Sequence, residues 1–366
     1  CSLDVLDYQK QLEIKNSRVA EIFPEAKPIL GSAKIWNYRS SAYFIFKKQS
    51  KKVVLTYSAK GSADFFAVHS CRVVPENFNE IIQTIQKLAN QFEFSVFNPT
   101  ISHGYFVGVE LRYSFAENKV MLIFHTKTED MKEKQKIIDA LVAKHPELVS
   151  IYHIQESCGK KQNRHVFGEK FIVEKWESGL KYRIAPFSIF YPNLFQAQGI
   201  FEWMKKELRI SGREKILELF CGSGIFSLAF AACSKMVYGL ERNTGAVREA
   251  ISNTHFNNTE NVIFIEQKID SLTVGDDILK DSIDILLLKP PREIPSSVIE
   301  VLKVKEIPKI MLIYSNLETL AAEIEKFKNL GYGVEKIQPF DLYPHSYHIE
   351  TVVFLRKKKK ILIKRK

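Results

Sequence analysis

The clearest signal in this chain is the segment Lys215-Ile-Leu-Glu-Leu-Phe-Cys-Gly-Ser-Gly-Ile-Phe-Ser-Leu-Ala-Phe230. It begins as a short apolar run, passes through a turn with two glycines and continues with helical periodicity, which predicts a strand, a loop and a helix. Gly222 and Gly224 carry no Cβ atom, so a ligand can lie against the backbone there and face the amides of the first helical turn. The segment therefore predicts a ligand-binding loop.

The next apolar run, residues 235–240, ends at Glu241. A carboxylate at the tip of a second parallel strand can accept hydrogen bonds from both hydroxyls of a ribose. Two nucleotide sites are compatible with this. A dinucleotide site asks for a third small residue, as in G-x-G-x-x-G, where this chain has Ser227. An acid in the first strand, here Glu218, followed by a G-x-G loop and a second acid, looks like the S-adenosylmethionine site of class I methyltransferases. An ordinary βαβ turn without a ligand is the third possibility.

The second half of the chain alternates predicted strands and helices, which is typical of a mostly parallel sheet with helices on both faces, an α/β fold. Ligands of such folds bind at the carboxyl ends of the strands, where the Gly222 loop, Glu241, Lys289 and Ser315 all fall. The predicted helices cover residues 194–208, 224–233, 243–256, 295–303 and 316–330, and the predicted strands cover 215–220, 236–240, 262–266, 283–288, 309–314, 334–340 and 350–355.

The first half has a different pattern, in which aromatic and β-branched residues recur with a period of two. That predicts an α+β module with an antiparallel sheet. The polar run 156–165 is predicted to be a surface loop, with RNA contact as the alternative. Helices are expected at 1–23, 77–92 and 130–144, and strands at 42–46, 52–56, 65–68, 104–112, 119–125, 149–154 and 170–176. The predicted domains are 1–180 for this module, 181–355 for the α/β domain and 356–366 for a basic tail.

Length and composition exclude several classes of protein. A chain of 366 residues is long enough for two domains with their own cores. No apolar run approaches the roughly 18 residues of a membrane span, and no signal-peptide pattern opens the sequence, so we expect a cytoplasmic protein without a membrane span. Five cysteines, at positions 1, 71, 158, 221 and 233, are scattered and odd in number, which argues against a disulfide framework.

The positive charge of the chain is concentrated near one end. The formal net charge is +11, and residues 356–366, Arg-Lys-Lys-Lys-Lys-Ile-Leu-Ile-Lys-Arg-Lys, carry eight positive charges and no negative ones. Such a run binds polyanions, above all nucleic acid, through salt-sensitive contacts with phosphates. The alternative is a solvated terminus without a specific partner. We favour RNA, because other features of the chain indicate the same partner.

Several motifs resemble those of the RNA uracil-5-methyltransferases, which methylate C5 of a uridine in tRNA or ribosomal RNA. The most specific is Pro339-Phe-Asp-Leu-Tyr-Pro-His-Ser-Tyr-His-Ile-Glu-Thr-Val352, close to the family's P-F-D-M-F-P-H-T-x-H-V-E-T-V. The resemblance covers nearly the whole chain and implies a class I S-adenosylmethionine-dependent methyltransferase domain, Rossmann-like in fold, preceded by an α+β RNA-binding module. The other matching motifs are S-I-F-Y-P-N at 188–193 with Gln196-Ala197, L-E-L-F-C-G-S-G at 217–224, G-L-E at 239–241, P-P-R at 290–292 and I-Y-S-N at 313–316.

The resemblance includes only part of the family's iron–sulfur motif. Cys1 looks like the third cysteine of that motif and Cys71 like the fourth, whereas the two upstream cysteines are absent. Two thiolates cannot hold a four-ligand cluster, so we expect no iron–sulfur cluster in this chain. Either the cluster has been lost or the sequence has been cut at its start.

The family's reaction, as the resemblance implies it, needs a nucleophile, a base and a methyl donor. A cysteine thiolate adds to C6 of uracil, the resulting enolate attacks the donor's methyl group, and a base then removes the C5 proton. The base position is retained as Glu350. The nucleophile position holds Ser315, and an unassisted hydroxyl is essentially never ionised at neutral pH, whereas a thiol is ionised in part.

The methyl-donor pocket implied by the resemblance is also altered. The family's Asp beside the donor is Lys289 here, a reversal of charge, and its Gln is Tyr191. Two positions that hold asparagine in the family are Ile225 and Lys268. The donor-contact positions that keep the family's residue types are Phe220, Gly222, Gly224 and Glu241.

These substitutions predict an RNA-binding relative of the family whose methyl transfer is lost or much reduced, a pseudoenzyme. S-adenosylmethionine is the cofactor that the resemblance implies, and the altered pocket puts its binding in doubt. The alternative is an active tRNA or rRNA uridine-C5 methyltransferase. A small-molecule methyltransferase is disfavoured by the basic tail and the large first module. We expect a monomer that binds RNA through Arg39, Arg112, Arg292 and His345.

Overall fold

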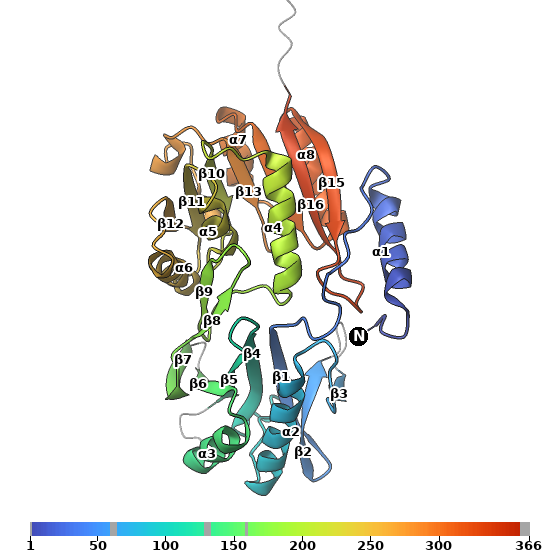
Figure 1. Ribbon diagram of the computed structural model, residues 1–366, viewed down its shortest axis with the longest axis vertical. Helices are drawn as coiled ribbons and strands as arrows, with labels where there is room; N and C mark the ends of the chain where they lie inside the picture. Colours follow the sequence, from blue (N-terminus) through green and yellow to red (C-terminus); the bar gives the residue numbers. More distant parts are fainter. Residues whose placement is uncertain (1, 59–63, 128–132, 158–159, 359–366) are drawn as a thin grey trace, which may run out of the picture. The chain divides into compact units, whose positions relative to one another are not determined.

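The chain folds into two units, one of which is discontinuous in sequence. The computed structural model describes residues 2–58, 64–127, 133–157 and 160–358. One unit contains Cys1–Ile35 and Ser188–Lys366, and the other contains Trp36–Phe187 (Figure 1). The sequence placed one boundary near residue 180 and assigned the first 35 residues to the α+β module. The structure differs, because those residues belong to the α/β unit and the α+β unit is inserted after them.

Helix α1 (Tyr8–Ile22) shows why the first residues belong with the α/β unit. Its first turn is capped by the Asp7 side chain, and Val19 on its apolar face joins the core of that unit. Lys15 Nζ lies 2.6 Å from Asp341 Oδ1, and both side chains are at most 1% exposed. The periodicity of the sequence predicts this helix and its apolar face, but it does not indicate on which sheet the face packs.

The α/β unit contains a seven-stranded sheet. Its strands are β10 (Lys215–Leu219), β11 (Met236–Glu241), β12 (Val262–Glu266), β13 (Ile285–Leu288), β14 (Lys309–Tyr314), β15 (Tyr332–Phe340) and β16 (Glu350–Lys357). They lie in the order β12-β11-β10-β13-β14-β16-β15, parallel except that β16 is antiparallel to both of its neighbours. The chain order reverses at β10, so the carboxyl end of β10 is the topological switch point where ligands of such sheets bind.

Helices cover both faces of this sheet, as the alternation of the sequence predicts. On one face, α7 (Ser296–Val304) and α8 (Leu317–Asn329) share an apolar core with α1 and with alternate strand residues such as Leu286 and Leu288. On the other face lie α4 (Leu194–Leu208), α5 (Ile225–Ala231) and α6 (Thr244–Phe256), and Figure 1 shows α4 in front of the central strands. The predicted elements of this unit are confirmed close to their expected bounds.

The inserted α+β unit contains a second seven-stranded sheet. Its strands are β1 (Ser41–Gln49), β2 (Lys52–Ser58), β3 (Phe65–Ala67), β4 (Phe106–Ser114), β5 (Lys119–Thr126), β6 (Leu148–Ser157) and β7 (Lys160–Gly168), in the order β3-β2-β1-β4-β5-β6-β7. Neighbouring strands are antiparallel except β5 and β6, which are parallel and joined through α3 (Lys134–Lys144). Helices α2 (Glu76–Gln91) and α3 pack on one face, and β8 (Ile172–Lys175) of the β8–β9 hairpin contacts β4 and β5. Strand β9 spans Lys181–Ile184.

One prediction for this unit is wrong. The polar run 156–165, predicted to be a loop, forms the end of β6 and most of β7, with Ile154 paired to Asn163 and His153 to Arg164. Strand β7 lies at the edge of the sheet, and residues 162–165 are exposed. An exposed edge strand tolerates polar side chains on both faces, so no apolar alternation marks it in the sequence.

The predicted basic tail lies mostly outside the described part of the chain. The structure describes residues 356–358, and Arg356 and Lys357 complete β16. Residues 359–366 are not among the described residues. In the described ranges, no helix is both long enough and apolar enough to cross a membrane.

Candidate active site

The loop after β10 holds the two glycines that the sequence marks as a ligand-binding turn. Gly222 has φ +55° and Gly224 has φ +75°, left-handed backbone conformations that glycine adopts without the steric cost of a Cβ atom. A Cβ at position 224 would also lie 2.4 Å from the ring of Phe264. Phe220, just before the loop, has a left-handed backbone as well, at φ +65°. The loop conformation therefore depends on glycine at 224 for two independent reasons.

Glu241, the last residue of β11, closes this loop. Its Oε2 accepts a hydrogen bond from the Gly222 N–H at 3.2 Å, and its Oε1 accepts one from the Asn243 N–H at 2.9 Å. The side chain is partly exposed, and each carboxylate oxygen can accept a further hydrogen bond. Glu241 is thus held in a position from which it can still accept hydrogen bonds from ribose hydroxyls.

Glu218 lies inside β10 and is only 4% exposed. Burial raises the pKa of its carboxyl group from the ordinary 4.5 to about 7, although the hydroxyl of Ser227 donates a hydrogen bond to it and lowers the pKa in part. Glu218 and Ser227, the two residues on which the choice between the dinucleotide and S-adenosylmethionine interpretations rested, are therefore hydrogen-bonded to each other. A carboxyl group with such a pKa is partly protonated at neutral pH.

Lys289, which follows β13, connects two other candidate residues. Its Nζ lies 3.8 Å from Glu350 Oε1 and 3.7 Å from the centre of the Tyr191 ring, so it makes both an ion pair and a cation–π contact. Burial lowers the pKa of Lys289, and the carboxylates of Glu350 and Glu218 oppose that shift. Glu350 is 4% exposed, and burial raises its pKa against the opposing charge of Lys289. The Glu350 carboxylate and the Lys289 ammonium stabilise each other's charge.

Ser315 is the exposed residue that follows β14. The antiparallel pairing of β14 with β16 places Tyr314 opposite Thr351, so Ser315 and Glu350 lie at the same end of the two strands. No hydrogen bond from the described residues reaches the Ser315 hydroxyl. The predicted nucleophile and base positions therefore come together, but among the described residues no hydrogen bond links the Ser315 hydroxyl to a base.

A cavity of about 130 Å³ lies beside the glycine loop, smaller than the roughly 300–1,000 Å³ of most ligand pockets. Tyr191, Lys289 and Glu218 line it, together with Phe220 and Gly222. The fold implies S-adenosylmethionine here, and its sulfonium is a cation. The Lys289 ammonium places a like charge on the cavity wall, and the Tyr191 ring takes up space. The Glu218 carboxyl lies on the same wall, and the Glu350 carboxylate pairs with Lys289, while Glu241 at the end of β11 suits a nucleoside.

Two of the four predicted RNA contacts are accessible. Arg292, between β13 and α7, is exposed. Arg39, just before β1, is partly exposed, and its Nε donates a hydrogen bond to the Ser41 carbonyl at 3.0 Å. Both can therefore present guanidinium groups to a phosphate, which is the contact that arginine favours.

The other two are engaged inside their own units. Arg112 is 11% exposed at its side chain, and its Nε donates to Glu110 Oε1 at 2.8 Å. His345 is 2% exposed, accepts a hydrogen bond at Nδ1 from Gln11 and donates from Nε2 to the Ile35 carbonyl, both at 3.0 Å. These contacts differ from the predicted role, because they leave neither side chain facing solvent. The motif around His345 gave no indication that its ring is buried.

Of the two predicted metal ligands, Cys1 lies outside the described residues. Cys71 is partly buried, and its backbone is held by Asn79 through hydrogen bonds of 2.8 and 3.1 Å. Within the described part of the chain, no group of three or more His, Cys, Asp or Glu side chains is arranged to hold a metal ion.

Sequence reasoning missed part of the cavity wall. Ile189, Phe226 and Tyr343 line the cavity but were not among the predicted site residues. Ile189 and Tyr343 lie inside motifs that carried the family resemblance, so a signal was present. Phe226 lies in the apolar sequence of α5, and nothing in the sequence distinguishes it from a residue of the hydrophobic core.

Known proteins resemble this chain over nearly its whole length. Residues 7–358 match the model of the tRNA (uracil-5-)-methyltransferase family. An uncharacterised RNA methyltransferase of Bacillus cereus is 25% identical over 97% of this chain and 81% of its own length. One from Leptospira interrogans is 28% identical over 95% of this chain and 93% of its own.

A solved structure has the same fold. The Pyrococcus abyssi tRNA (uracil-54, C5)-methyltransferase, in complex with S-adenosyl-L-homocysteine, superposes with a TM-score of 0.80 at 24% identity, covering 97% of this chain and 85% of that one. This confirms the predicted fold class, a methyltransferase-type α/β domain with an α+β module. The family match spans nearly all of the sequence. The chain belongs to the tRNA (uracil-5-)-methyltransferase family.

Proposed function

We propose that this chain binds structured RNA and that its ability to methylate C5 of uridine is lost or much reduced. The position of the Lys289 ammonium carries this proposal, because it lies 3.8 Å from Glu350 Oε1 and 3.7 Å from the Tyr191 ring centre. That ammonium engages the residue expected to act as the base. It also stands where the resemblance implies an acidic neighbour of the methyl donor.

The nucleophile position supports the same conclusion. Addition to C6 of uracil requires an anionic nucleophile, and a thiol supplies one far more readily than a hydroxyl. Serine can serve when a base holds its proton, as in the Ser-His-Asp arrangement. Ser315 has no such partner among the described residues, and the nearby Glu350 is paired with Lys289.

Electrostatics disfavour the donor as well. Two unit positive charges about 6 Å apart repel by about 3 kcal/mol at an effective dielectric constant of about 20, which corresponds to roughly a hundredfold in affinity. Glu350 offsets part of that repulsion, but only while it is ionised and paired with Lys289. The donor therefore meets a cation where the family offers a carboxylate.

An active uridine-C5 methyltransferase is the second candidate function. One observation favours it: the β14–β16 register brings Ser315 and Glu350 to one end of the sheet, as a nucleophile and a base would need. Burial raises the pKa of Glu350, which is the direction that a stronger general base needs.

Methyl transfer separates the two candidates. The wild-type protein, a Glu350→Ala control and a Ser315→Cys/Lys289→Asp double variant are incubated with labelled S-adenosylmethionine and total undermodified RNA. We expect no incorporation at uridine C5 for the first two and a measurable gain for the double variant. Incorporation by wild type above the Glu350→Ala background would refute the loss of activity.

RNA binding is tested separately. Fluorescence anisotropy measures the affinity for a labelled structured RNA at several salt concentrations. Because several phosphate contacts are expected, the logarithm of the dissociation constant should rise with the logarithm of the salt concentration with a slope of about 3 or more. Arg292→Gln should reduce that slope by about 1. Absence of saturable binding at low salt would refute the RNA-binding part of the proposal.

A further inference from the structure

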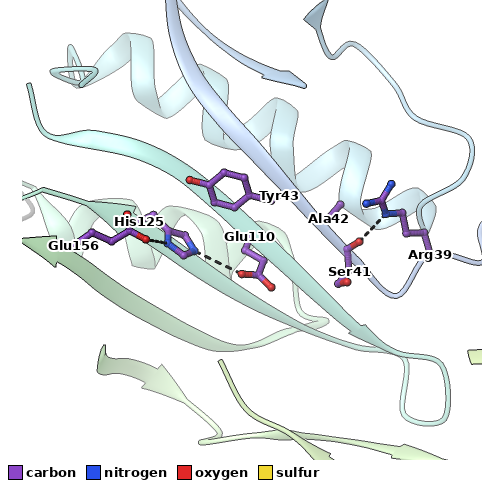
Figure 2. A pocket seen from close by; sticks show the side chains of 7 residues that line it. All are labelled: Arg39, Ser41, Ala42, Tyr43, Glu110, His125 and Glu156. Atoms are coloured by element: carbon purple, nitrogen blue, oxygen red, sulfur yellow. Dashed lines mark hydrogen bonds and ion pairs between the residues drawn. The ribbon is translucent and has the colours of Figure 1, made fainter. Parts of the chain in front are cut away.

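The α+β unit has a polar pocket on the face of its sheet that is opposite α2 and α3. Side chains alternate across a strand. Phe44, Val109 and Phe124 point into the core beneath the helices, so their neighbours Tyr43, Glu110 and His125 point to the other face. Together with Arg39 and Glu156 they line a pocket of about 340 Å³ (Figure 2). Its volume falls at the lower end of the roughly 300–1,000 Å³ of small-ligand sites.

His125 is the unusual member of this pocket. It is 6% exposed, and neither ring nitrogen has a hydrogen-bond partner among the described residues. Its Nε2 lies 3.6 Å from Glu110 Oε2 and its Nδ1 lies 3.5 Å from Glu156 Oε1, longer than the 2.7–3.2 Å of ordinary hydrogen bonds. Buried polar atoms are normally satisfied, so an imidazole held between two carboxylates in this way indicates a missing polar partner.

A metal ion does not fit this arrangement. The two carboxylates face opposite nitrogens of one ring, so a single ion cannot contact both pairs (Figure 2). Among the residues that the structure describes, no third His, Cys, Asp or Glu completes a metal site here. The pocket instead pairs hydrogen-bond acceptors, Glu110 and Glu156, with the guanidinium of Arg39 as a donor. A fitting ligand has one edge of donors and another of acceptors.

The geometry points to a guanine base, and we propose that this pocket binds one unpaired guanine of the RNA partner. Guanine presents adjacent N–H donors on one edge and the O6 and N7 acceptors on the other, and arginine commonly recognises O6 and N7. Uracil presents a single N–H between two carbonyl oxygens, which the carboxylates would repel. Tyr43 lines the pocket and is 38% exposed as a residue, and an aromatic ring there can stack on a base. Unpaired bases of RNA are recognised in this way.

This inference rests on the proposed RNA binding, and its ligand chemistry, a guanine base, has two possible sources. One is a nucleotide within RNA and the other is a free guanine nucleotide. To distinguish the two sources, the affinity of the protein is measured for two single-stranded RNA heptamers, UUUGUUU and UUUUUUU. The affinities for free GMP and free UMP are measured in parallel.

We expect UUUGUUU to bind about tenfold more tightly than UUUUUUU, the usual discrimination of one well-paired base. Glu156→Gln should abolish that difference without changing the affinity for UUUUUUU, and Tyr43→Ala should reduce it. Glu177→Gln, which removes an exposed carboxylate from the same unit, is the matched control and should change nothing. Circular dichroism confirms that each variant is folded.

Equal affinity for the two heptamers, or an advantage for guanine that survives Glu156→Gln, overturns the inference. Tight binding of GMP with no heptamer preference overturns the RNA source. If both heptamers and a structured RNA fail to bind, the proposed function itself fails. If structured RNA binds and guanine gives no advantage, only the pocket assignment fails.

Discussion

Replacement of Lys289 by methionine tests the ion pair on which the proposed loss of activity depends. The substitution keeps the length and apolar stem of the side chain and removes the ammonium 3.8 Å from Glu350 Oε1. Breaking a fully buried pair costs about 3–5 kcal/mol, and an exposed pair is worth about 0–1 kcal/mol. Lys289 is 35% exposed at its side chain whereas Glu350 is 5% exposed, so we expect an intermediate loss, about 2 kcal/mol at pH 8.

The loss should depend on pH in a defined direction. Burial raises the pKa of Glu350 in the folded protein, and the charge of Lys289 partly opposes that rise. Without Lys289 the folded-state pKa is higher still. The cost of an uncompensated carboxylate is present above that pKa and disappears as the pH falls and the group takes up a proton. At pH 5 the free energy of unfolding of the variant should therefore be less than about 1 kcal/mol below that of wild type.

Chemical denaturation at pH 5, 6.5 and 8, followed by tryptophan fluorescence, measures the free energy of unfolding. Lys303→Met is the matched control, since Lys303 Nζ lies 2.6 Å from Glu300 but both side chains are more than half exposed. That control should cost no more than about 1 kcal/mol. Equal losses in the two variants at every pH, or a Lys289 loss that grows as the pH falls, would refute the reasoning.

Three further predictions concern the same unit. The stability of the Glu218→Gln variant relative to wild type should rise by about 3 kcal/mol between pH 4.5 and pH 8. In that range the wild-type carboxyl group, whose pKa is raised to about 7, loses its proton more readily in the unfolded than in the folded protein, which lowers the stability of wild type. Denaturation curves at several pH values measure the difference. Gly224→Ala should cost about 3 kcal/mol and Gly212→Ala only about 1–2 kcal/mol, since both glycines have positive φ but a Cβ meets other atoms only at Gly224; thermal unfolding of the two variants compares them. Lys15→Met should cost about 3–5 kcal/mol, and a second change, Asp341→Asn, should restore part of that, as a double-mutant cycle in urea would show.

Most of the α/β unit could be predicted from the sequence, because its elements carry strong local signals. Strand β10 is an apolar run that ends in a glycine turn, and α4 begins after Asn193, whose side chain caps it by accepting a hydrogen bond from Gln196 N at 3.1 Å. Strand β7 could not be predicted, since its pairing partner, rather than its own polar residues, makes it a strand.

The candidate site was predictable in position but not in its contacts. Parallel strands end at one edge, so the loop at Gly222 and the residues Glu241 and Lys289 were expected together. The family resemblance placed Lys289 and Tyr191 in one pocket, but it did not predict the cation–π contact between them, because neither residue is the one that the family has there. The buried His125 was missed for a related reason: a histidine in an apolar strand looks like core until its neighbours on β4 and β6 are known.

The insertion of Trp36–Phe187 into the α/β unit has a consequence during protein synthesis. The ribosome produces α1 long before β15 and the segment after it, which carries Asp341, the partner of Lys15. The inserted unit is contiguous and can form its own core first, whereas α1 must keep its apolar side chains from aggregating until the last strands emerge. Nascent chains arrested well beyond residue 190 should therefore resist proteases from Trp36 onwards while α1 is still cut.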